Sequence, residues 1–503
     1  MGQKAEEAGE RRLIDAPCGA VSGLAAPGAW LYRAIPFAQA PVAALRFCPP
    51  APHPGWTGVH AADHWPAPPM QGPSVPPVVA PDTPDPSEDC LYLNVWTPRE
   101  GTGHPVFVWV HGGANIVGSS SMPVFDGARF AAQGIVCVTL TYRVGAFGFL
   151  ELGDVLGEAY RGSGLNGLRD IAAGLDWVHA NIAAFGGDPD RITIGGQSAG
   201  AKNIAALVAS DLLRIPLHGV ISQSGGGQTV ATPEEGALLC REMLRALDVG
   251  ADDAVRLLTM PPQAFLDAQA NVVARYPHKF PFRPVVDGQV LPATPLAGYE
   301  AGRSARIPML IGHVRDESPV GGPALPRDGT VASGQLANMT LEDFHARYAA
   351  YAGLYPSLDA EGRKYRALAA EEYGVPSLRL AEAHVRNGGA CWVYRFDLPS
   401  AQGHSAGLCR HGSELPLTWD KLDDPLSCHL GPVGPVAQEI GALMHGAWVA
   451  FLHRQTPSTA AFAWPAYRLE DRLSARFGAE AVIVADLDRD ERLIWEGWPR
   501  AVA

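Results

Sequence analysis

Lysine is scarce in this chain: only five of its 39 basic residues are lysines, and arginine supplies the other 34. With abundant alanine, glycine and proline, this bias is typical of GC-rich coding and predicts a bacterial source. Clusters of basic residues are absent, and the formal net charge is −13. Polyanions repel such a chain, so we expect neither nucleic acid nor an anionic membrane as a partner.

Long apolar runs are also missing. No segment approaches the ~20 apolar residues that a membrane helix needs, and the charged segment Met1 to Glu7 has no apolar stretch behind it. We therefore expect a cytoplasmic protein. Its eight cysteines show no paired spacing, and a long chain with its own core needs no disulfides, which predicts reduced, structural thiols.

The chain does have ample material for a core, since hydrophobic residues make up 47% of its 503 residues. Near-continuous apolar runs alternate with helical patterns, as parallel strands covered on both faces require. The pattern predicts an α/β fold with a large, mostly parallel sheet, in one domain over residues 1–503. The predicted strands are 106–110, 135–142, 191–194, 219–221, 308–311 and 391–396, and the predicted helices are 167–184 and 435–454.

Two segments interrupt this pattern. Residues 66–86 contain nine prolines, which excludes a core strand or helix and predicts an extended surface loop. Residues 318–338 are rich in glycine and proline, and 341–387 have a helical pattern that we expect to be less tightly tied to the sheet. We interpret approximately 66–86 and 318–387 as insertions that cap a site.

A candidate nucleophile lies in Gly196-Gln197-Ser198-Ala199-Gly200. Strand-like residues precede this motif, and an apolar, helix-like run over 199–208 follows it. At such a strand-to-helix elbow, the two glycines allow a sharp turn that exposes the serine hydroxyl. The helix N-terminus then directs its dipole and free N–H groups at an oxyanion formed there.

The same motif recurs at Gly403-His404-Ser405-Ala406-Gly407. No strand-like run precedes this second copy, and no helical period follows it. We therefore interpret Ser405 as a hydroxyl in a glycine-rich loop and Ser198 as the candidate nucleophile.

A nucleophilic serine needs a histidine as base, an acid that orients the histidine, and N–H donors for the oxyanion. At an elbow of this kind, the acid and then the histidine follow the serine along the chain. Glu317 follows the predicted strand 308–311 and His411 follows 391–396, so their order fits. Asp316 and, more weakly, Asp397 compete for the acid position, and spacing does not separate Asp316 from Glu317.

The N–H donors are expected in His111-Gly112-Gly113-Ala114, which comes directly off the predicted strand 106–110. Small residues there let backbone N–H groups approach a substrate carbonyl. With the N–H of Ala199, this loop could form an oxyanion hole of three donors.

Further blocks of sequence are distinctive when taken together: Tyr32 to Ala38 with Leu45 to Phe47, Ser87 to Val95, Asn181 to Pro189, Pro284 to Gly288, and Trp464 to Tyr467. They cover most of the chain, and with the elbow they resemble the type B carboxylesterase family, the relatives of cholinesterases and bacterial p-nitrobenzyl esterases. The resemblance implies the α/β-hydrolase fold. It also implies the catalytic residues Ser198, Glu317 and His411, and the oxyanion residues Gly113, Ala114 and Ala199.

The chain departs from this family at several positions. The family usually has glutamate before the serine, whereas Gln197 stands here, which should weaken any attraction for cationic substrates. Asn115 stands where an aromatic residue commonly follows the oxyanion residues, which should make that wall of the pocket more polar. No aromatic residue lies between Trp65 and Tyr92, where cholinesterases place a tryptophan, so a cation–π site for choline is not expected.

Two more features concern supporting residues. The family's first disulfide would pair Cys90 with a cysteine near Met70, and because methionine stands there we expect Cys90 to be free. Glu414 lies three residues after His411, where it could support the site or simply cap a helix. His60 and His64 have the i, i+4 spacing of a metal site but lack a third ligand, so we interpret them as surface residues.

These observations predict a hydrolase that acts through an acyl-enzyme on small or medium, non-cationic carboxylic esters, without metal or cofactor. Two alternatives remain open. One is an acyltransferase that uses the same acyl-enzyme, and the other is a catalytically inactive binding protein of the same family.

Overall fold

A computed structural model describes residues 9–73, 79–317, 329–401 and 406–498. The chain forms two compact units. The first consists of Met1–Gly219, Ala231–Ala274 and Phe282–Pro292, and the second of Val220–Val230, Arg275–Pro281 and Ala293–Ala503.

The first unit contains a sheet with antiparallel strands on one side and parallel strands on the other. Its order is β1 (Arg11–Ala16), β2 (Gly19–Ala26), β3 (Ala29–Pro36), β5 (Tyr92–Pro98), β7 (Val136–Leu140), β6 (His104–Val110) and β8 (Gly187–Gln197), with β4 (Val59–Ala61) beside β2. Strands β6 and β7 pair in parallel, as do β6 and β8. Nearly every residue of β6 and β7 is buried, as expected of parallel strands covered on both faces.

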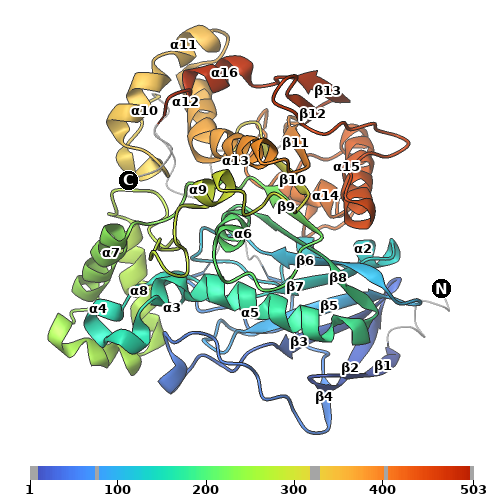
Figure 1. Ribbon diagram of the computed structural model, residues 1–503, viewed down its shortest axis with the longest axis vertical. Helices are drawn as coiled ribbons and strands as arrows, with labels where there is room; N and C mark the ends of the chain where they lie inside the picture. Colours follow the sequence, from blue (N-terminus) through green and yellow to red (C-terminus); the bar gives the residue numbers. More distant parts are fainter. Residues whose placement is uncertain (1–8, 74–78, 318–328, 402–405, 499–503) are drawn as a thin grey trace. The chain divides into compact units, whose positions relative to one another are not determined.

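Helices of the first unit are α2 (Ala128–Ala132), α3 (Gly145–Phe149), α4 (Gly153–Leu156), α5 (Asn166–Asn181), α6 (Ala199–Ala209), α7 (Pro233–Ala246) and α8 (Pro262–Val273). In Figure 1, α5 runs along the sheet, and it contacts both β8 and α6. Every residue of α6 is buried, and apart from Lys202 and Asn203 its sequence is made of apolar or small residues. Helix α6 therefore holds a fixed position behind the end of β8.

The second unit has its own set of mostly parallel strands. They are β9 (Gly219–Gln223), β10 (Met309–Val314), β11 (Cys391–Phe396), β12 (Leu473–Phe477) and β13 (Ala481–Ala485), and only the last pair is antiparallel. Because β10 and β11 are parallel neighbours, the loops that follow them begin at the same edge of the sheet.

Helices of the second unit are α9 (Pro295–Glu300), α10 (Leu341–Tyr348), α11 (Tyr351–Leu354), α12 (Ala360–Ala369), α13 (Val375–Arg386), α14 (Leu415–Thr418), α15 (Pro435–Arg454) and α16 (Arg489–Ile494). Figure 1 shows α10 to α12 near α16. Phe344, Tyr351, Leu368 and Trp495 join these helices in one apolar cluster. The predicted helical character of 341–387 is confirmed.

The expectation that this whole segment is loosely tied to the sheet is wrong. Helix α13 contacts both β10 and β11. Its inner face is buried through Leu380, Ala381 and His384. A short π-helix, Ala370–Gly374, joins α12 to α13. The segment therefore packs directly on the parallel strands.

The proline-rich segment 66–86 also differs from its prediction. Its described residues, 66–73 and 79–86, form neither helix nor strand, as predicted. However, Pro66, Pro68, Pro69 and Gln71 are buried rather than on the surface. The Gln71 side chain donates to the Gly118 carbonyl over 2.9 Å and accepts from the Gly118 N–H over 2.9 Å. Two bonds to one backbone residue hold this part of the segment inward.

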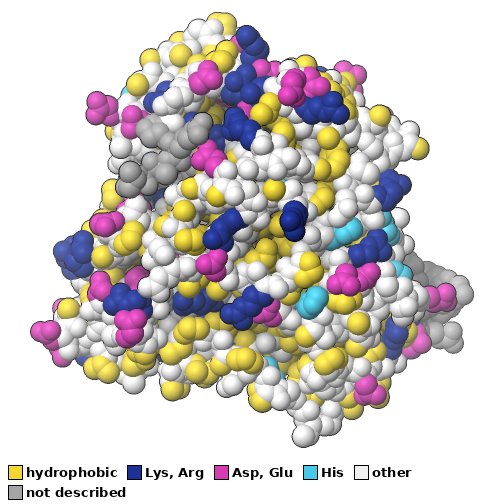
Figure 2. All heavy atoms as spheres, viewed as in Figure 1, with side chains coloured by type: hydrophobic (Ala, Val, Ile, Leu, Met, Phe, Trp, Pro, Cys, Tyr) yellow, Lys and Arg dark blue, Asp and Glu magenta, His cyan; other side chains and the backbone are white. Residues whose placement is uncertain are grey.

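All eight cysteines are free in the structure, and five of them are buried. Cys90 is fully buried, and it lines a small cavity together with Met70. None of the helices in the described part of the chain combines the length and the apolar character that a bilayer crossing requires. On the face drawn in Figure 2, acidic and basic side chains are interspersed among uncharged ones.

Candidate active site

Ser198 stands at a strained strand-to-helix turn in the first unit. It directly follows β8 and precedes α6, with φ 59° and ψ −129°. A serine rarely adopts a positive φ, so the surrounding structure must hold it there. As the first residue of α6, Ala199 has no acceptor for its N–H within the helix.

The glycines on either side of Ser198 are required by close packing against β6. A Cβ atom on Gly200 would lie 2.2 Å from the Val110 carbonyl oxygen, and one on Gly196 would lie 2.9 Å from the same oxygen. Any larger residue would push the elbow away from the end of β6. The motif therefore has a structural reason at both glycines.

The predicted oxyanion loop lies against this elbow. A Cβ atom on Gly112 would come within 2.7 Å of the Gln197 carbonyl oxygen and 3.0 Å of Ser198 Cβ. Three successive residues after it, Gly113, Ala114 and Asn115, have φ values of 119°, 55° and 57°. Ala114 and Asn115 lie in a region that residues other than glycine rarely adopt, so the surrounding contacts must hold this loop in place.

Asn115 is buried, and its amide makes several hydrogen bonds within the first unit. Its Nδ2 donates to the Phe282 carbonyl over 3.2 Å. Its Oδ1 accepts from Asn203 Nδ2 over 2.9 Å and from the Tyr142 hydroxyl over 3.4 Å. The side chain thus anchors the loop within the first unit, and the more polar pocket wall that the sequence predicts at this position stays a prediction.

His111 opens this loop but is not suited to act as a base. The ring is fully buried and stacks on Tyr142 with centroids 4.5 Å apart. Burial lowers the pKa of His111 to about 4, so the imidazole is neutral at pH 7. The Tyr142 hydroxyl also donates to the His111 carbonyl over 2.9 Å, which fixes where the loop leaves β6.

Glu317 and His411 meet in the second unit. The Glu317 carboxylate contacts His411 Nδ1 through its Oε2, and its Oε1 accepts from the Val314 N–H over 3.0 Å. The His411 N–H in turn donates to the Glu317 carbonyl over 2.8 Å. Glu317 is fully buried and has a φ of 54°. The pair is therefore held through both side chains and backbone.

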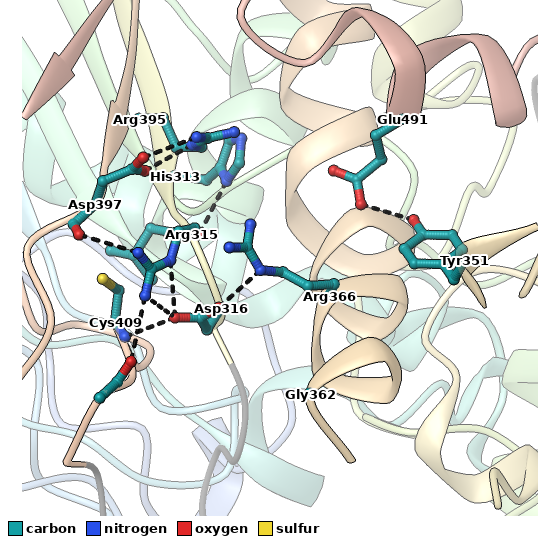
Figure 3. Close-up of polar contacts among 12 residues, drawn as sticks. His313, Arg315, Asp316, Tyr351, Gly362, Arg366, Arg395, Asp397, Cys409 and Glu491 are labelled. Atoms are coloured by element: carbon teal, nitrogen blue, oxygen red, sulfur yellow. Dashed lines mark hydrogen bonds and ion pairs between the residues drawn. The ribbon is translucent and has the colours of Figure 1, made fainter. Parts of the chain in front are cut away.

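The two rival acids have other partners. Asp397 pairs with Arg395, whose Nε lies 2.6 Å from its Oδ1. Asp316 pairs with Arg315 and Arg366 at 2.9 Å each. Figure 3 shows both aspartates turned toward arginines. Of the three candidate acids, Glu317 is the one in contact with the histidine.

Tyr373 is a site residue that sequence analysis missed. Its ring lies over the His411 imidazole, with centroids 4.6 Å apart and planes inclined by 33°. The residue belongs to the π-helix between α12 and α13. No sequence signal could have found it, because a lone tyrosine 38 positions before the histidine carries no motif.

Glu414 is also close to the pair. It stands at the N-cap of α14, but its side chain makes no capping bond. Instead its Oε1 accepts from Gln223 Nε2 over 3.1 Å, and Gln223 Oε1 accepts from Trp448 Nε1 over 3.2 Å. Burial, with a smaller contribution from the negative charge of Glu317, raises the pKa of Glu414 to about 7.

Three further residues considered in the sequence are Ser405, His60 and His64. Ser405 lies outside the described residues. His60 is half-buried, with its Nε2 2.9 Å from the Ala34 carbonyl, whereas the His64 side chain is 63% exposed. Across the residues that the structure describes, no group of three or more His, Cys, Asp or Glu side chains is arranged to hold a metal ion.

The strand order, the strained serine elbow and the buried Glu–His pair together define the α/β-hydrolase class of enzymes. Solved structures support this assignment. The chain superposes on a carboxylesterase from Geobacillus stearothermophilus with a TM-score of 0.82 and 32% identity, over 96% of this chain and 100% of that one.

The chain belongs to the carboxylesterase family, whose profile matches residues 10–493. It is 33% identical to a para-nitrobenzyl esterase of Bacillus subtilis (strain 168), over 96% of this chain and 98% of that protein. It is 31% identical to a phenmedipham hydrolase of Pseudarthrobacter oxydans, with the same coverage of both chains. These findings confirm the predicted family, the α/β-hydrolase fold and the carboxylesterase class of enzyme.

Proposed function

We propose that this protein hydrolyses small or medium, non-cationic carboxylic esters through a Ser198–His411–Glu317 triad. The observation that carries the proposal is the contact between Glu317 and His411. These residues are 94 positions apart, and each was predicted separately from its place after a strand that follows Ser198 in the chain. In that contact the carboxylate holds the Nδ1–H of the imidazole, which leaves Nε2 as the base.

The reaction then follows from the chemistry of these groups. His411 Nε2 takes the Ser198 proton while Oγ attacks the ester carbonyl, and the N–H groups of Gly113, Ala114 and Ala199 stabilise the oxyanion. Collapse of the tetrahedral intermediate breaks the ester bond, and His411 gives its proton to the leaving alcohol. Water, deprotonated by His411, then attacks the acyl-enzyme, releases the acid and restores the Ser198 hydroxyl.

We also propose that all 503 residues form one catalytic domain and that segments 66–86 and 318–387 border the substrate site. The contact between the Tyr373 and His411 rings supports this role for the second segment, because it brings an inserted residue next to the proposed base.

Serine substitution tests the proposal. Ser198→Ala is expected to lower kcat for a p-nitrophenyl ester by about 10⁴-fold or more, because no other group replaces the nucleophile. A fluorophosphonate probe should label the wild type and Ser405→Ala but not Ser198→Ala. Full esterase activity in Ser198→Ala would overturn the assignment, and labelling without turnover would favour the inactive binding protein.

A further inference from the structure

Asp316 and Glu317 are adjacent acids with different partners. Glu317 contacts His411, whereas the Asp316 carboxylate, also buried, faces a cluster of donors. Its Oδ2 accepts from the Cys409 N–H over 2.8 Å and from Arg315 Nη2 over 2.9 Å, and its Oδ1 lies 2.9 Å from Arg366 Nε. Figure 3 shows Asp316 between these three groups.

The three donors come from three separate segments. Arg315 directly follows β10, Arg366 lies on α12, and Cys409 stands two residues before His411. The backbone reinforces the last connection, because the N–H groups of Asp316 and Glu317 both donate to the Cys409 carbonyl, over 3.2 and 3.0 Å. One carboxylate thus ties the loop that carries the histidine to the loop that carries its acid.

Arg315 extends the same connection toward the start of the histidine loop. Its N–H donates to the Phe396 carbonyl at the end of β11 over 2.9 Å. Its guanidinium donates to the Gly407 carbonyl over 3.3 Å and to the Asp397 carbonyl over 3.4 Å. The Arg315–Asp316 pair therefore contacts the loop where it leaves β11 and again just before His411.

This connection between the two loops matters because the Glu317 backbone is strained. Its φ of 54° is unfavourable for a residue with a long side chain, so neighbouring contacts must hold it. Displacements of about 1 Å between catalytic groups can cost about 10²-fold in rate. A residue that fixes both loops controls the geometry of the Glu317–His411 contact.

We propose that Asp316 is a positioning residue, which holds the His411 loop in register with Glu317 through Cys409, Arg315 and Arg366. The inference rests on the proposed function of Glu317 and His411. Asp316 does not touch the imidazole and acts only through the two loops.

Asp316→Asn tests this role with little change in volume. The variant loses the negative charge that both arginines require. We expect kcat for a p-nitrophenyl ester to fall about 10- to 100-fold, while KM stays within about threefold, because substrate binding does not involve Asp316. Arg366→Gln, which removes one partner, should give a smaller loss in the same direction.

A second measurement follows the loop that carries His411 directly. Hydrogen exchange of peptide 406–412 should be faster in Asp316→Asn, and this measurement does not depend on activity.

Glu382→Gln is the matched control. The Glu382 side chain is 13% exposed, compared with 6% for Asp316, and it likewise pairs with two arginines, Arg386 and Arg472. The Glu382→Gln variant should leave kcat and the hydrogen exchange of peptide 406–412 unchanged. If hydrogen exchange of peptide 406–412 is unchanged in Asp316→Asn, Asp316 does not hold the His411 loop. If exchange is faster but kcat is unchanged, Asp316 holds the loop without positioning His411 for catalysis. Failure of the proposed function would instead appear as wild-type turnover that survives Ser198→Ala.

Discussion

Glu414 illustrates how one buried carboxyl affects stability. Its pKa is raised from an ordinary 4.5 to about 7 by burial and by the charge of Glu317. A raised carboxyl pKa means that the folded state binds a proton which the unfolded state releases above about pH 4.5. The protein therefore loses stability as pH rises through the interval between these two values, and the loss is complete above about pH 7.

Glu414→Gln should remove this loss, since the amide cannot ionise and its oxygen can still accept from Gln223. The difference in the free energy of unfolding between variant and wild type should therefore be larger at pH 8 than at pH 4.5, by up to about 3 kcal/mol in favour of the variant. Thermal unfolding at both pH values measures the gain. The exposed Glu158→Gln is the control and should show no such pH dependence. An equal effect of Glu414→Gln at the two pH values would contradict the raised pKa.

At the scale of elements, the buried pair Arg143–Asp170 joins the end of β7 to α5. Asp170 accepts from Arg143 Nη2 over 2.7 Å, from Nε over 2.8 Å and from its backbone N–H over 3.0 Å, and both side chains are almost completely buried. Since Arg143 also donates to the Cys48 carbonyl over 2.8 Å, the pair connects three segments of the first unit.

Asp170→Asn should destabilise the protein by about 3–5 kcal/mol, because it leaves a buried guanidinium without its counter-charge. The midpoint of thermal unfolding measures this change. Asp154→Asn is the control, because Asp154 pairs with Arg161 over 3.5 Å and its side chain is 80% exposed. Exposed pairs contribute about 0–1 kcal/mol. If the unfolding midpoint falls equally in Asp170→Asn and Asp154→Asn, the buried pair contributes no more to stability than the exposed one.

At the scale of the whole molecule, charge and site chemistry have opposite effects on substrate choice. The net charge of −13 attracts cations in general, but beyond about 8 Å physiological salt screens this attraction. The residue directly before the proposed nucleophile is Gln197, which is neutral and buried. We therefore expect the local side chain to determine the preference.

The wild type should hydrolyse a neutral ester, such as 3,3-dimethylbutyl acetate, with a higher kcat/KM than its cationic isostere acetylcholine. Gln197→Glu should raise the cationic-to-neutral ratio by about tenfold, which corresponds to about 1.4 kcal/mol of added attraction. Steady-state kinetics with both esters at 0.15 M salt test this. A ratio that is unchanged in Gln197→Glu would show that residue 197 does not act on the substrate alcohol.

Much of the fold could be predicted because its signals are local. The buried parallel strands β6, β8 and β10 appear as near-continuous apolar runs, and α15 begins and ends at its predicted residues. The antiparallel strands β1 and β2 were missed because they are partly exposed and lack that pattern. Strand β3 was also missed, although nearly all of its residues are buried, because Arg33 interrupts its apolar run. The burial of 66–71 was missed because it depends on Gln71 reaching Gly118, 47 positions away.

The sequence alone determined the family, the serine elbow and the order of its partners, since turn glycines and apolar periodicity act within a few residues. Through the family resemblance the sequence also favoured Glu317 over Asp316 as the acid, although spacing alone did not separate them. Only the tertiary structure decided that Glu414 bonds Gln223 rather than capping a helix and that Tyr373 covers the imidazole. Each of these contacts joins distant segments. Adjacent residues such as Asp316 and Glu317 differ only in the direction that the folded backbone gives to their side chains.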